Sequence, residues 1–366
     1  MIQRHSGCRQ PPGKRILADS LPTSTAPELA VTARGSPRFW EQGGWPVPLL
    51  TPLEGVYRMA VAARRGYYRR NPYAEGRLPA PVLVVGNLTV GGTGKTPLVI
   101  WLVEKAHSLG HRPGVILRGH GGRRPGPEAV SPQSDPREVG DEAVLIARRT
   151  HCPVVIGRDR PAAGKALLDR GDVDLVISDD GLQHYPLGRD GEIAVVDARR
   201  GLGNGHCLPA GPLREPPARL QTVDLILANG SGWPGADGEF ELRPADLLPL
   251  TPTSATQSPP QPGQTVHAVA GIGHPERFFT TLESLGFRVT RHAFADHHGF
   301  QPADLEFATN GQPLIMTEKD AVKCHGFPLT NSWILPVYAS PDEPTQRRLT
   351  RLLGRITHKP AGQGVP

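Results

Sequence analysis

The sequence predicts an α/β fold: a large parallel sheet covered by helices, followed by a second, smaller α/β domain. Short runs rich in β-branched residues alternate with helical segments, which is the order that a parallel sheet requires. These runs show little polar–apolar alternation, as expected for strands that helices cover on both faces. A stretch rich in Pro, Gly, Ser and Thr at 230–263 separates two such series. We therefore expect two domains joined by a linker.

The expected elements follow this pattern in order. In the first domain we expect strands at 82–85, 113–117, 153–156, 173–180, 192–197 and 223–229, and helices at 95–109, 141–149 and 160–169. In the second domain we expect strands at 265–272 and 313–317, with a helix at 275–285 between them. Gly110 and Gly286 follow helical segments at the place where a left-handed C-terminal residue is favoured.

Domain boundaries follow from composition. The first 36 residues are polar and rich in Pro, Ser, Thr and Arg, so they predict a disordered extension. The predicted divisions are a disordered extension at 1–36, a membrane-surface amphipathic helix at 37–70, a core at 71–229, a linker at 230–263, a smaller C-terminal lid domain at 264–357 and a tail at 358–366.

Composition narrows the class of protein. The chain has 366 residues, 38% of them hydrophobic, with 43 glycines and 40 prolines, which describes a loop-rich globular protein. No run approaches the roughly 20 apolar residues that a membrane-spanning helix needs. The net charge of +6 suits anionic partners: phosphates, acidic lipid or nucleic acid. The four cysteines lack metal-ligand spacing, so reduced thiols in a cytoplasmic protein are expected.

A glycine-rich turn follows the apolar run at 82–85 and leads into a helix. Its core reads Gly-Gly-Thr-Gly-Lys-Thr and ends at Thr96. Glycines let consecutive backbone N–H groups curve around phosphate oxygens, and the helix N-terminus adds its positive dipole. Lys95 would neutralise the β- and γ-phosphates, and the Thr96 hydroxyl would hold Mg²⁺. We therefore expect a P-loop that binds ATP or GTP, rather than a plain glycine turn. The expected nucleotide contacts are Thr89, Val90, Gly91, Gly92, Thr93, Gly94, Lys95 and Thr96.

The segment at 46–70 combines an apolar helical face with clustered Arg and Tyr. Its apolar positions, spaced as on one side of a helix, are Leu53, Val56, Tyr57, Ala60 and Val61. Such a helix could lie on an anionic membrane surface, with arginines paired to headgroups. The same face could instead pack on the neighbouring domain.

Two carboxylates end the strand expected at 173–180. Asp179 and Asp180 lie at the carboxyl edge of the sheet, where the P-loop also falls and where ligands bind in such folds. Oxygen ligands at this place match the Mg²⁺-binding carboxylates that accompany a P-loop. The alternative is an ordinary turn before Gly181.

A phosphoryl-transfer enzyme also needs a group to accept the proton of the acceptor hydroxyl. Asp141 and His297 are the candidates. Asp141 also fits the N-cap of the helix that follows it. Asp296, His297 and His298 could suggest a metal site, but three consecutive side chains cannot all face one ion.

Six motifs, in this order along the chain, make it resemble the tetraacyldisaccharide 4′-kinase family. They are GNLTVGGTGKTP at 86–97, VGDE at 139–142, DDGLQH at 179–184, LPAGPLRE at 208–215, FADHH at 294–298 and TEKDAVK at 317–323. The resemblance extends from about Trp40 to Leu353. Thr89 stands where the usual P-loop has its first glycine, and this is the family's own form of the motif.

The resemblance implies a P-loop NTPase-like kinase that transfers the γ-phosphate of ATP, with Mg²⁺, to the 4′-hydroxyl of a tetraacylated disaccharide 1-phosphate lipid. It implies a peripheral enzyme on the cytoplasmic face of the inner membrane, against an anionic membrane surface, in lipid A biosynthesis. Asp141 would be the catalytic base, His297 would support it from a lid domain, and Asp179 and Asp180 would serve Mg²⁺. Further active-site or substrate positions implied are Arg118, Arg160, Gln183, His184 and Glu215. No obligate protein partner is inferred.

One departure from the family pattern concerns His120, which stands where relatives usually carry tyrosine. Two other functions compete with the kinase. A membrane-associated nucleotide switch would share the P-loop, but it has no need of His297 opposite the phosphates. A nucleic-acid-binding ATPase rests on net charge alone, without a recognition motif, so we expect no nucleic-acid partner.

Overall fold

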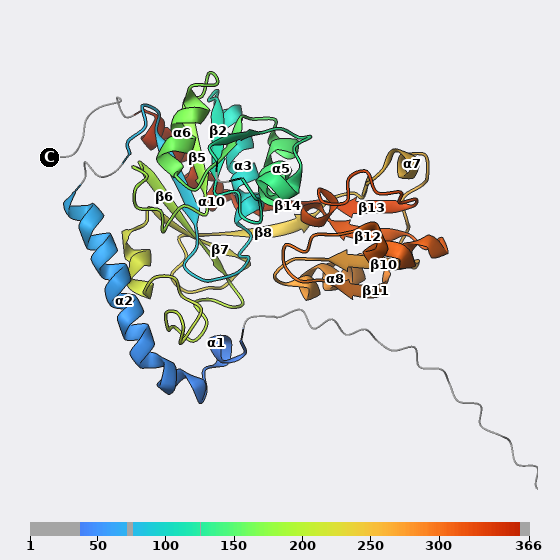
Figure 1. Cartoon of the computed structure of the whole chain (residues 1–366), viewed down its shortest axis with the longest axis horizontal. Helices are drawn as coiled ribbons and strands as arrows, with labels where there is room; N and C mark the ends of the chain where they lie inside the picture. Colours follow the sequence, from blue (N-terminus) through green and yellow to red (C-terminus); the bar gives the residue numbers. More distant parts are fainter. Residues whose placement is uncertain (1–36, 72–75, 125, 359–366) are drawn as a thin grey trace, which may run out of the picture. The chain divides into compact units, whose positions relative to one another are not determined.

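A computed structural model describes residues 37–71, 76–124 and 126–358. The extension predicted at 1–36 and all but the first residue of the tail predicted at 358–366 therefore lie outside the described residues. Two mostly parallel sheets, one of nine strands and one of five, organise the described chain (Figure 1). The predicted α/β class is confirmed.

The nine-stranded sheet has the order β14-β8-β7-β6-β1-β5-β2-β4-β3. Its strands are β1 (Val82–Gly86), β2 (Pro113–Leu117), β3 (Glu128–Val130), β4 (Val154–Ile156), β5 (Leu175–Asp179), β6 (Gly191–Asp197), β7 (Leu225–Asn229), β8 (Gly238–Pro244) and β14 (Val337–Pro341). Pairing is parallel except at the two edges, where β14 runs antiparallel to β8 and β3 antiparallel to β4. The strand β1 that carries the P-loop lies between β5 and β6, in the middle of the sheet.

Helices cover both faces of this sheet. The helices of the described chain are α1 (Phe39–Gln42), α2 (Pro46–Arg70), α3 (Lys95–Ser108), α4 (Pro136–Val139), α5 (Asp141–Thr150), α6 (Arg160–Leu168), α7 (Pro252–Ala255), α8 (Pro275–Ser284), α9 (Glu318–Ala321) and α10 (Glu343–Thr357), with 3₁₀ turns at Pro217–Thr222 and Pro302–Asn310. Along β1, Leu83 and Val85 join a core with α3, α5 and α10, whereas Val82 and Val84 join a second core with α6. Because both faces are buried, the sequence shows no alternation there.

The five-stranded sheet has the order β11-β10-β12-β13-β9. Its strands are β9 (Leu248–Pro249), β10 (Thr265–Ala270), β11 (Arg288–Ala293), β12 (Leu314–Thr317) and β13 (Ser332–Leu335). The first four strands of this order pair in parallel, and β9 closes the edge antiparallel to β13. The helix α8 packs Phe278, Phe279 and Leu282 against one face.

Two segments differ from the predicted organisation. The linker expected at 230–263 contains strands of both sheets, β8 and β9. The lid expected at 264–357 ends with two elements that pack with the first sheet. The strand β14 pairs with β8, and Leu349 and Leu353 of α10 share a hydrophobic core with Leu83 and Val85 of β1. The strands β8 and β14 pair although about a hundred residues separate them in the chain. The chain therefore leaves the first sheet after β8, forms the second sheet and then returns to the first sheet with β14.

The helix α2 has two different faces. Glu54 is buried, where it accepts a hydrogen bond from the Cys207 backbone at 2.9 Å, and Tyr57 donates from its hydroxyl to the Arg214 carbonyl at 2.9 Å. The side of the helix away from the core carries exposed apolar side chains at helical spacing: Leu49, Leu53, Val56, Met59 and Tyr67, with Trp45 just before the helix. Packing on the core thus uses one side of the helix and leaves an apolar stripe uncovered. None of the described helices is both long and apolar enough to cross a membrane.

Candidate active site

The P-loop joins β1 to α3, and its geometry depends on glycine. Gly94 immediately precedes α3 with φ of 88°, in the left-handed region, and an added Cβ would lie 2.5 Å from the Asn229 amide nitrogen. Lys95 begins the helix and donates to the Asn87 side-chain oxygen at 3.0 Å. Asn87, which is fully buried, also donates to the Thr89 carbonyl at 2.8 Å. These contacts fix the shape of the loop around Lys95.

Asp179 and Asp180 end β5 beside the P-loop, but their surroundings differ. Asp180 has φ of 48°, an uncommon conformation for a residue other than glycine, and it receives ion pairs from Lys95 at 3.3 Å and Arg214 at 2.9 Å. These cations outweigh the effect of burial and hold the pKa of Asp180 well below its usual range. Asp179 is 2% exposed, and its Oδ1 has no hydrogen-bond partner. Burial, with the charges of Glu142 and Asp180, raises the pKa of Asp179 to about 7.

Arg160 holds the end of β5 through hydrogen bonds to backbone carbonyls. Its guanidinium is buried and donates to the Asp179 carbonyl at 2.9 Å and the Gly157 carbonyl at 3.3 Å. Its backbone N–H donates to the His184 ring at 3.4 Å. Burial and the nearby charges of Arg160 and Arg189 lower the pKa of His184 to about 4, so His184 is neutral at pH 7. Arg160 thus fixes the backbone that presents the two carboxylates.

Asp141 and His297 meet at the boundary between the two sheets. Gly140, with φ of 91°, immediately precedes α5, so Asp141 is the first residue of the helix and not its N-cap. Its Oδ1 accepts from the Glu142 backbone at 2.9 Å, and its Oδ2 lies 3.1 Å from Nδ1 of His297. His297 follows β11 with φ of 60°. The hydrogen bond to Asp141 raises the pKa of His297. Conversely, the interactions of Asp141 with His297 and the neighbouring lysines outweigh burial and lower the pKa of Asp141.

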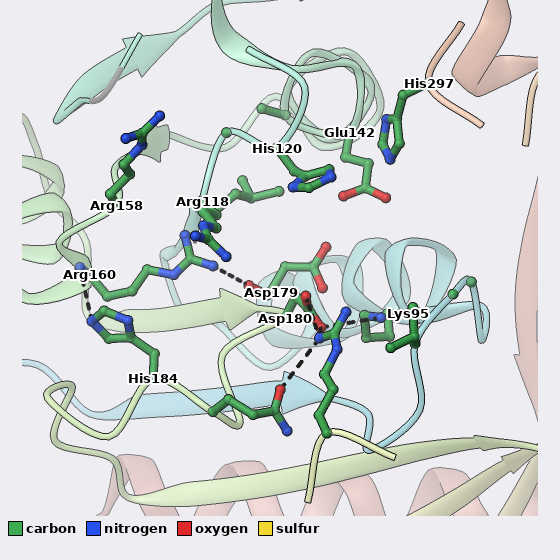
Figure 2. A pocket seen from close by; sticks show the side chains of 18 of the residues that line it. Lys95, Arg118, His120, Glu142, Arg158, Arg160, Asp179, Asp180, His184 and His297 are labelled. Carbon is green, nitrogen blue, oxygen red and sulfur yellow. Dashed lines mark hydrogen bonds and ion pairs between the residues drawn. The ribbon is translucent and has the colours of Figure 1, made fainter. Parts of the chain in front are cut away.

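One cavity of about 760 Å³ lies among these elements, and Lys95, Asp179, Asp180 and His297 are among its lining residues. Figure 2 shows Lys95, Asp179 and Asp180 together, with Glu142, His120 and His297 across the cavity from them. The lining residues are Tyr57, Arg64, Val90, Gly91, Gly92, Lys95, Leu117, Arg118, Gly119, His120, Glu142, Ala143, Arg158, Arg160, Asp179, Asp180, Gln183, His184, Arg214, Asp296, His297 and Lys319. The cavity therefore joins a P-loop, two carboxylates and an imidazole.

Comparison with known proteins identifies the family of this chain. The family model described as tetraacyldisaccharide-1-P 4′-kinase matches residues 47–354. The chain belongs to this family. It is 52% identical over 323 residues to the tetraacyldisaccharide 4′-kinase of Alkalilimnicola ehrlichii, covering 87% of this chain and 97% of that protein. It is 50% identical over 311 residues to the protein of the same name from Nitrosococcus oceani, covering 83% and 89%.

A solved structure shares the fold. The crystal structure of an "apo" form of LpxK from Aquifex aeolicus in complex with ATP superposes with a TM-score of 0.71 at 27% sequence identity. The match covers 86% of this chain and all of that chain. The predicted kinase fold and the predicted family are both confirmed.

The structure separates the predicted site residues into two groups. Those that line the cavity are Val90, Gly91, Gly92, Lys95, Arg118, Arg160, Asp179, Asp180, Gln183, His184 and His297. Thr89, Thr93, Gly94, Thr96, Asp141 and Glu215 belong to the same elements but lie outside the lining. Glu215 is 1% exposed and accepts from Gln183 at 3.0 Å and Tyr185 at 2.5 Å, which makes it a support for Gln183.

Several lining residues were not predicted as site residues. Glu142 and Arg214 directly follow or precede predicted positions, and Lys319 lies in the motif at 317–323, to which no role had been given. His120 stands edge-to-face with His297, with ring centroids 5.1 Å apart. Glu142 and Arg214 could have been found from the sequence, because each lies next to a predicted site residue in the same motif.

Proposed function

We propose that this protein transfers the γ-phosphate of ATP to the 4′-hydroxyl of a tetraacylated disaccharide 1-phosphate, forming the 4′-phosphorylated lipid A precursor. The observation that carries the proposal is the cavity in which Lys95, Asp179 and Asp180 face His297 from the other sheet. Family membership supplies the reaction class, and the solved relative in complex with ATP supports ATP as the phosphate donor.

The residues at the P-loop fit Mg²⁺. Among the described residues, no cluster of three or more His, Cys, Asp or Glu side chains could hold a metal alone. Mg²⁺ is commonly bound by one or two carboxylates together with nucleotide phosphates and waters. The buried Oδ1 of Asp179 has no hydrogen-bond partner in the fold, and Asp180 and the Thr96 hydroxyl would complete the ligand set. Bound there, Mg²⁺ would neutralise charge on the β- and γ-phosphates.

We propose that His297 accepts the proton of the acceptor hydroxyl and that Asp141 positions it. His297 lines the cavity, whereas Asp141 is 4% exposed and lies behind the imidazole. The Asp141 carboxylate accepts from Nδ1, which leaves Nε2 for the proton, and it favours the protonated ring that results. This assignment exchanges the roles expected from the family resemblance, in which Asp141 was the base. Both residues stay in the proposed catalytic pair.

The arginine-rich lining of the cavity suits an anionic acceptor. Arg64, Arg118 and Arg158 line the cavity, and Arg64 comes from α2. Because α2 also carries the exposed apolar stripe, one helix would contact both the lipid surface and the cavity. We propose that the stripe lies on an anionic membrane surface at the cytoplasmic face of the inner membrane, with arginines near the headgroups.

The competing function is a nucleotide switch without lipid phosphotransfer. It is not favoured, because the family is one of kinases and because a switch needs no imidazole opposite the P-loop. The deciding experiment supplies purified protein with detergent-dispersed tetraacyldisaccharide 1-phosphate, Mg²⁺ and γ-labelled ATP. Label on the 4′ position of the lipid supports the proposal. Release of free phosphate without labelled lipid, at normal ATP binding, refutes it and supports the switch.

A further inference from the structure

Lys319 is a cation whose backbone is fixed at the end of β12. Thr317 caps α9 by accepting from the Asp320 backbone at 3.2 Å, and the buried Asp320 accepts from the Gly271 backbone at 2.8 Å. Glu318 is tied to Arg149 of α5 at 2.6 Å. With both neighbouring side chains engaged away from it, Lys319 extends into the cavity that also contains the P-loop.

Three side chains surround the Lys319 ammonium. Its Nζ lies 3.3 Å from Glu142 Oε1, 3.5 Å from Asp296 Oδ1 and 3.3 Å from Nε2 of His297. An ammonium can only donate hydrogen bonds. When His297 is neutral, Nε2 is therefore the acceptor from Lys319, and Nδ1 carries the proton toward Asp141. Lys319 thus donates to Nε2 of His297, the same nitrogen that receives the proton of the lipid hydroxyl in the proposed reaction.

The charge state of Lys319 is secure. Burial disfavours an ammonium, but the carboxylates of Glu142, Asp141 and Asp296 outweigh this and raise the pKa of Lys319 above its usual range. The side chain is 18% exposed, so a full positive charge lies in a largely desolvated place. An electrostatic interaction made there with a phosphate is stronger than one made in water.

Lys319 also differs in origin from the other cations of the cavity. Within the described chain, the lining residues contributed by the second sheet and its loops are Asp296, His297 and Lys319. Lys95 and Arg214 are already committed to Asp180. Asp296, the ion-pair partner of Lys319, lies close to the loop after β10 that borders the P-loop: a Cβ added at Gly273 in that loop would lie 3.4 Å from Asp296 Oδ2 and 3.7 Å from the Gly92 backbone nitrogen. Lys319 therefore faces the phosphate site from the opposite wall.

We propose that Lys319 is a catalytic residue that binds the phosphoryl group during transfer, and that its movement from His297 to this group frees Nε2 to accept the proton. Proton removal is thereby coupled to nucleotide occupancy. This inference rests on the proposed function. It adds a cation on the wall opposite Lys95, where charge on the equatorial phosphoryl oxygens is stabilised in transfer reactions.

The step balances as follows. The acceptor oxygen forms a bond to the γ-phosphorus, and the bond from that phosphorus to the β–γ bridging oxygen breaks. The bridging oxygen leaves with the electron pair as part of ADP. The hydroxyl proton passes to Nε2 of His297, and Lys319 stays protonated throughout.

The test compares Lys319→Met with Arg149→Met. Both variants break an ion pair between α5 and α9, but Arg149 pairs with Glu318 and does not line the cavity in the described structure. For Lys319→Met we expect kcat for lipid phosphorylation to fall about 100-fold, the magnitude seen when a preorganised donor to a transition state is removed. ATP affinity should change less than about threefold. Arg149→Met should lower Tm while kcat stays within about threefold of wild type.

A transition-state analogue supplies a second measurement. Lys319→Met and Lys319→Gln should bind ADP with aluminium fluoride and Mg²⁺ about 100-fold more weakly than wild type, with unchanged affinity for a non-hydrolysable ATP analogue. This binding measurement needs only folded protein that binds nucleotide, and not the lipid acceptor.

The outcomes are distinguishable. Equal losses of kcat in Lys319→Met and Arg149→Met would show that Lys319 has only a structural role, as an ion pair between α5 and α9, and would overturn the inference. So would retention of a third or more of wild-type kcat in Lys319→Met, or unchanged binding of the fluoride complex. Failure of the wild-type protein itself to label the lipid would instead refute the proposed function.

Discussion

His297 and Asp141 face each other from different sheets, with Nδ1 of the imidazole 3.1 Å from Oδ2 of the carboxylate. They are 156 positions apart in the chain, and His297 holds a backbone φ of 60° at this contact. The carboxylate of Asp141 is nearly inaccessible, whereas the imidazole lines the cavity. Of the two side chains, only the imidazole is therefore open to the cavity.

Asp141→Asn should slow transfer and shift its pH dependence. Asp141 raises the pKa of His297, so removing its charge lowers that pKa toward and below the ordinary value. Because His297 must be neutral to accept a proton, activity rises with pH through its pKa, and the acid limb of kcat/KM should move to lower pH. The plateau should fall about 100-fold or more, since the protonated ring loses its partner. ATP affinity should stay within about threefold.

The measurement is the pH profile of kcat/KM for wild type and Asp141→Asn, with ATP affinity determined separately. An unshifted acid limb with an undiminished plateau would contradict the proposed pair.

The exposed apolar stripe of α2 should be needed for binding to lipid surfaces but not for folding. Leu53 and Val56 are 57% and 60% exposed, so Leu53→Glu with Val56→Glu costs little stability. It should reduce binding to anionic phospholipid vesicles by about tenfold or more, because apolar insertion is lost and charge repulsion is added. Leu109→Glu, at an exposed apolar residue after α3, is the matched control and should bind like wild type.

Vesicle co-sedimentation with an ATP-binding assay checks this prediction. Equal vesicle binding by the double variant and the Leu109→Glu control would exclude α2 as the membrane-contacting element.

Much of the first sheet could be predicted because its information is local. The strands β1, β2, β5, β6 and β7 are continuous apolar runs, and the P-loop identifies which strand lies beside the carboxylates. The strand β8 was missed because it lies within a Pro- and Gly-rich stretch, and only Phe240 and Gly238 are buried in a run of charged residues. Its partner β14 lies about a hundred residues away, and no local pattern shows that they pair.

In the candidate site, too, local features could be predicted from the sequence, whereas long-range contacts could not. Residues at strand ends near the P-loop follow from topology, as Asp179 and Asp180 show. The environment of a side chain does not: the sequence indicates neither that Asp141 is buried behind His297 nor that Lys319 contacts both Glu142 and His297. These contacts join the two sheets, so they depend on tertiary packing. The resemblance named Asp141 and His297 together, and the geometry adds that His297 lines the cavity whereas Asp141 does not.

His292 should make the protein less stable at acid pH. Its ring stacks on Phe307 at 3.7 Å and lies 3.0 Å from the His267 ring, and burial with the His267 charge lowers the pKa of His292 to about 4. A histidine with a lowered pKa favours folding above its unfolded pKa of about 6.5, and this contribution is lost as pH falls toward 4. Because the ring is only half-buried, we expect a loss on the order of 1 kcal/mol between pH 7.5 and 5.0.

His292→Phe keeps the aromatic stack without the titrating group, so its unfolding free energy should fall less over this range. Urea unfolding at both pH values measures the difference, with exposed His107→Gln as the control. Parallel losses in wild type and His292→Phe would assign the acid sensitivity to other groups.

Asp179→Asn should stabilise the metal-free protein while removing its response to Mg²⁺. The pKa of Asp179 is raised to about 7, so folding favours the neutral carboxyl group. That preference is a stability contribution present at low pH and lost as pH rises through 7, because the charged form is then buried beside Glu142 and Asp180. Asparagine has the same shape and no charge, so at pH 8 the metal-free variant should melt at a higher temperature than wild type.

The same substitution removes a charged oxygen from the proposed Mg²⁺ site. With ATP analogue present, Mg²⁺ should raise Tm in wild type, since a ligand that binds only the folded state stabilises it, and the increase should be lost in Asp179→Asn. The Mg²⁺ concentration for half-maximal kinase rate should rise about tenfold or more. Asp172→Asn changes an exposed carboxylate paired with Arg112 and should match wild type in both assays. A variant that melts below wild type without metal, or that keeps the full Mg²⁺ response, would show that Asp179 serves the strand end and not the ion.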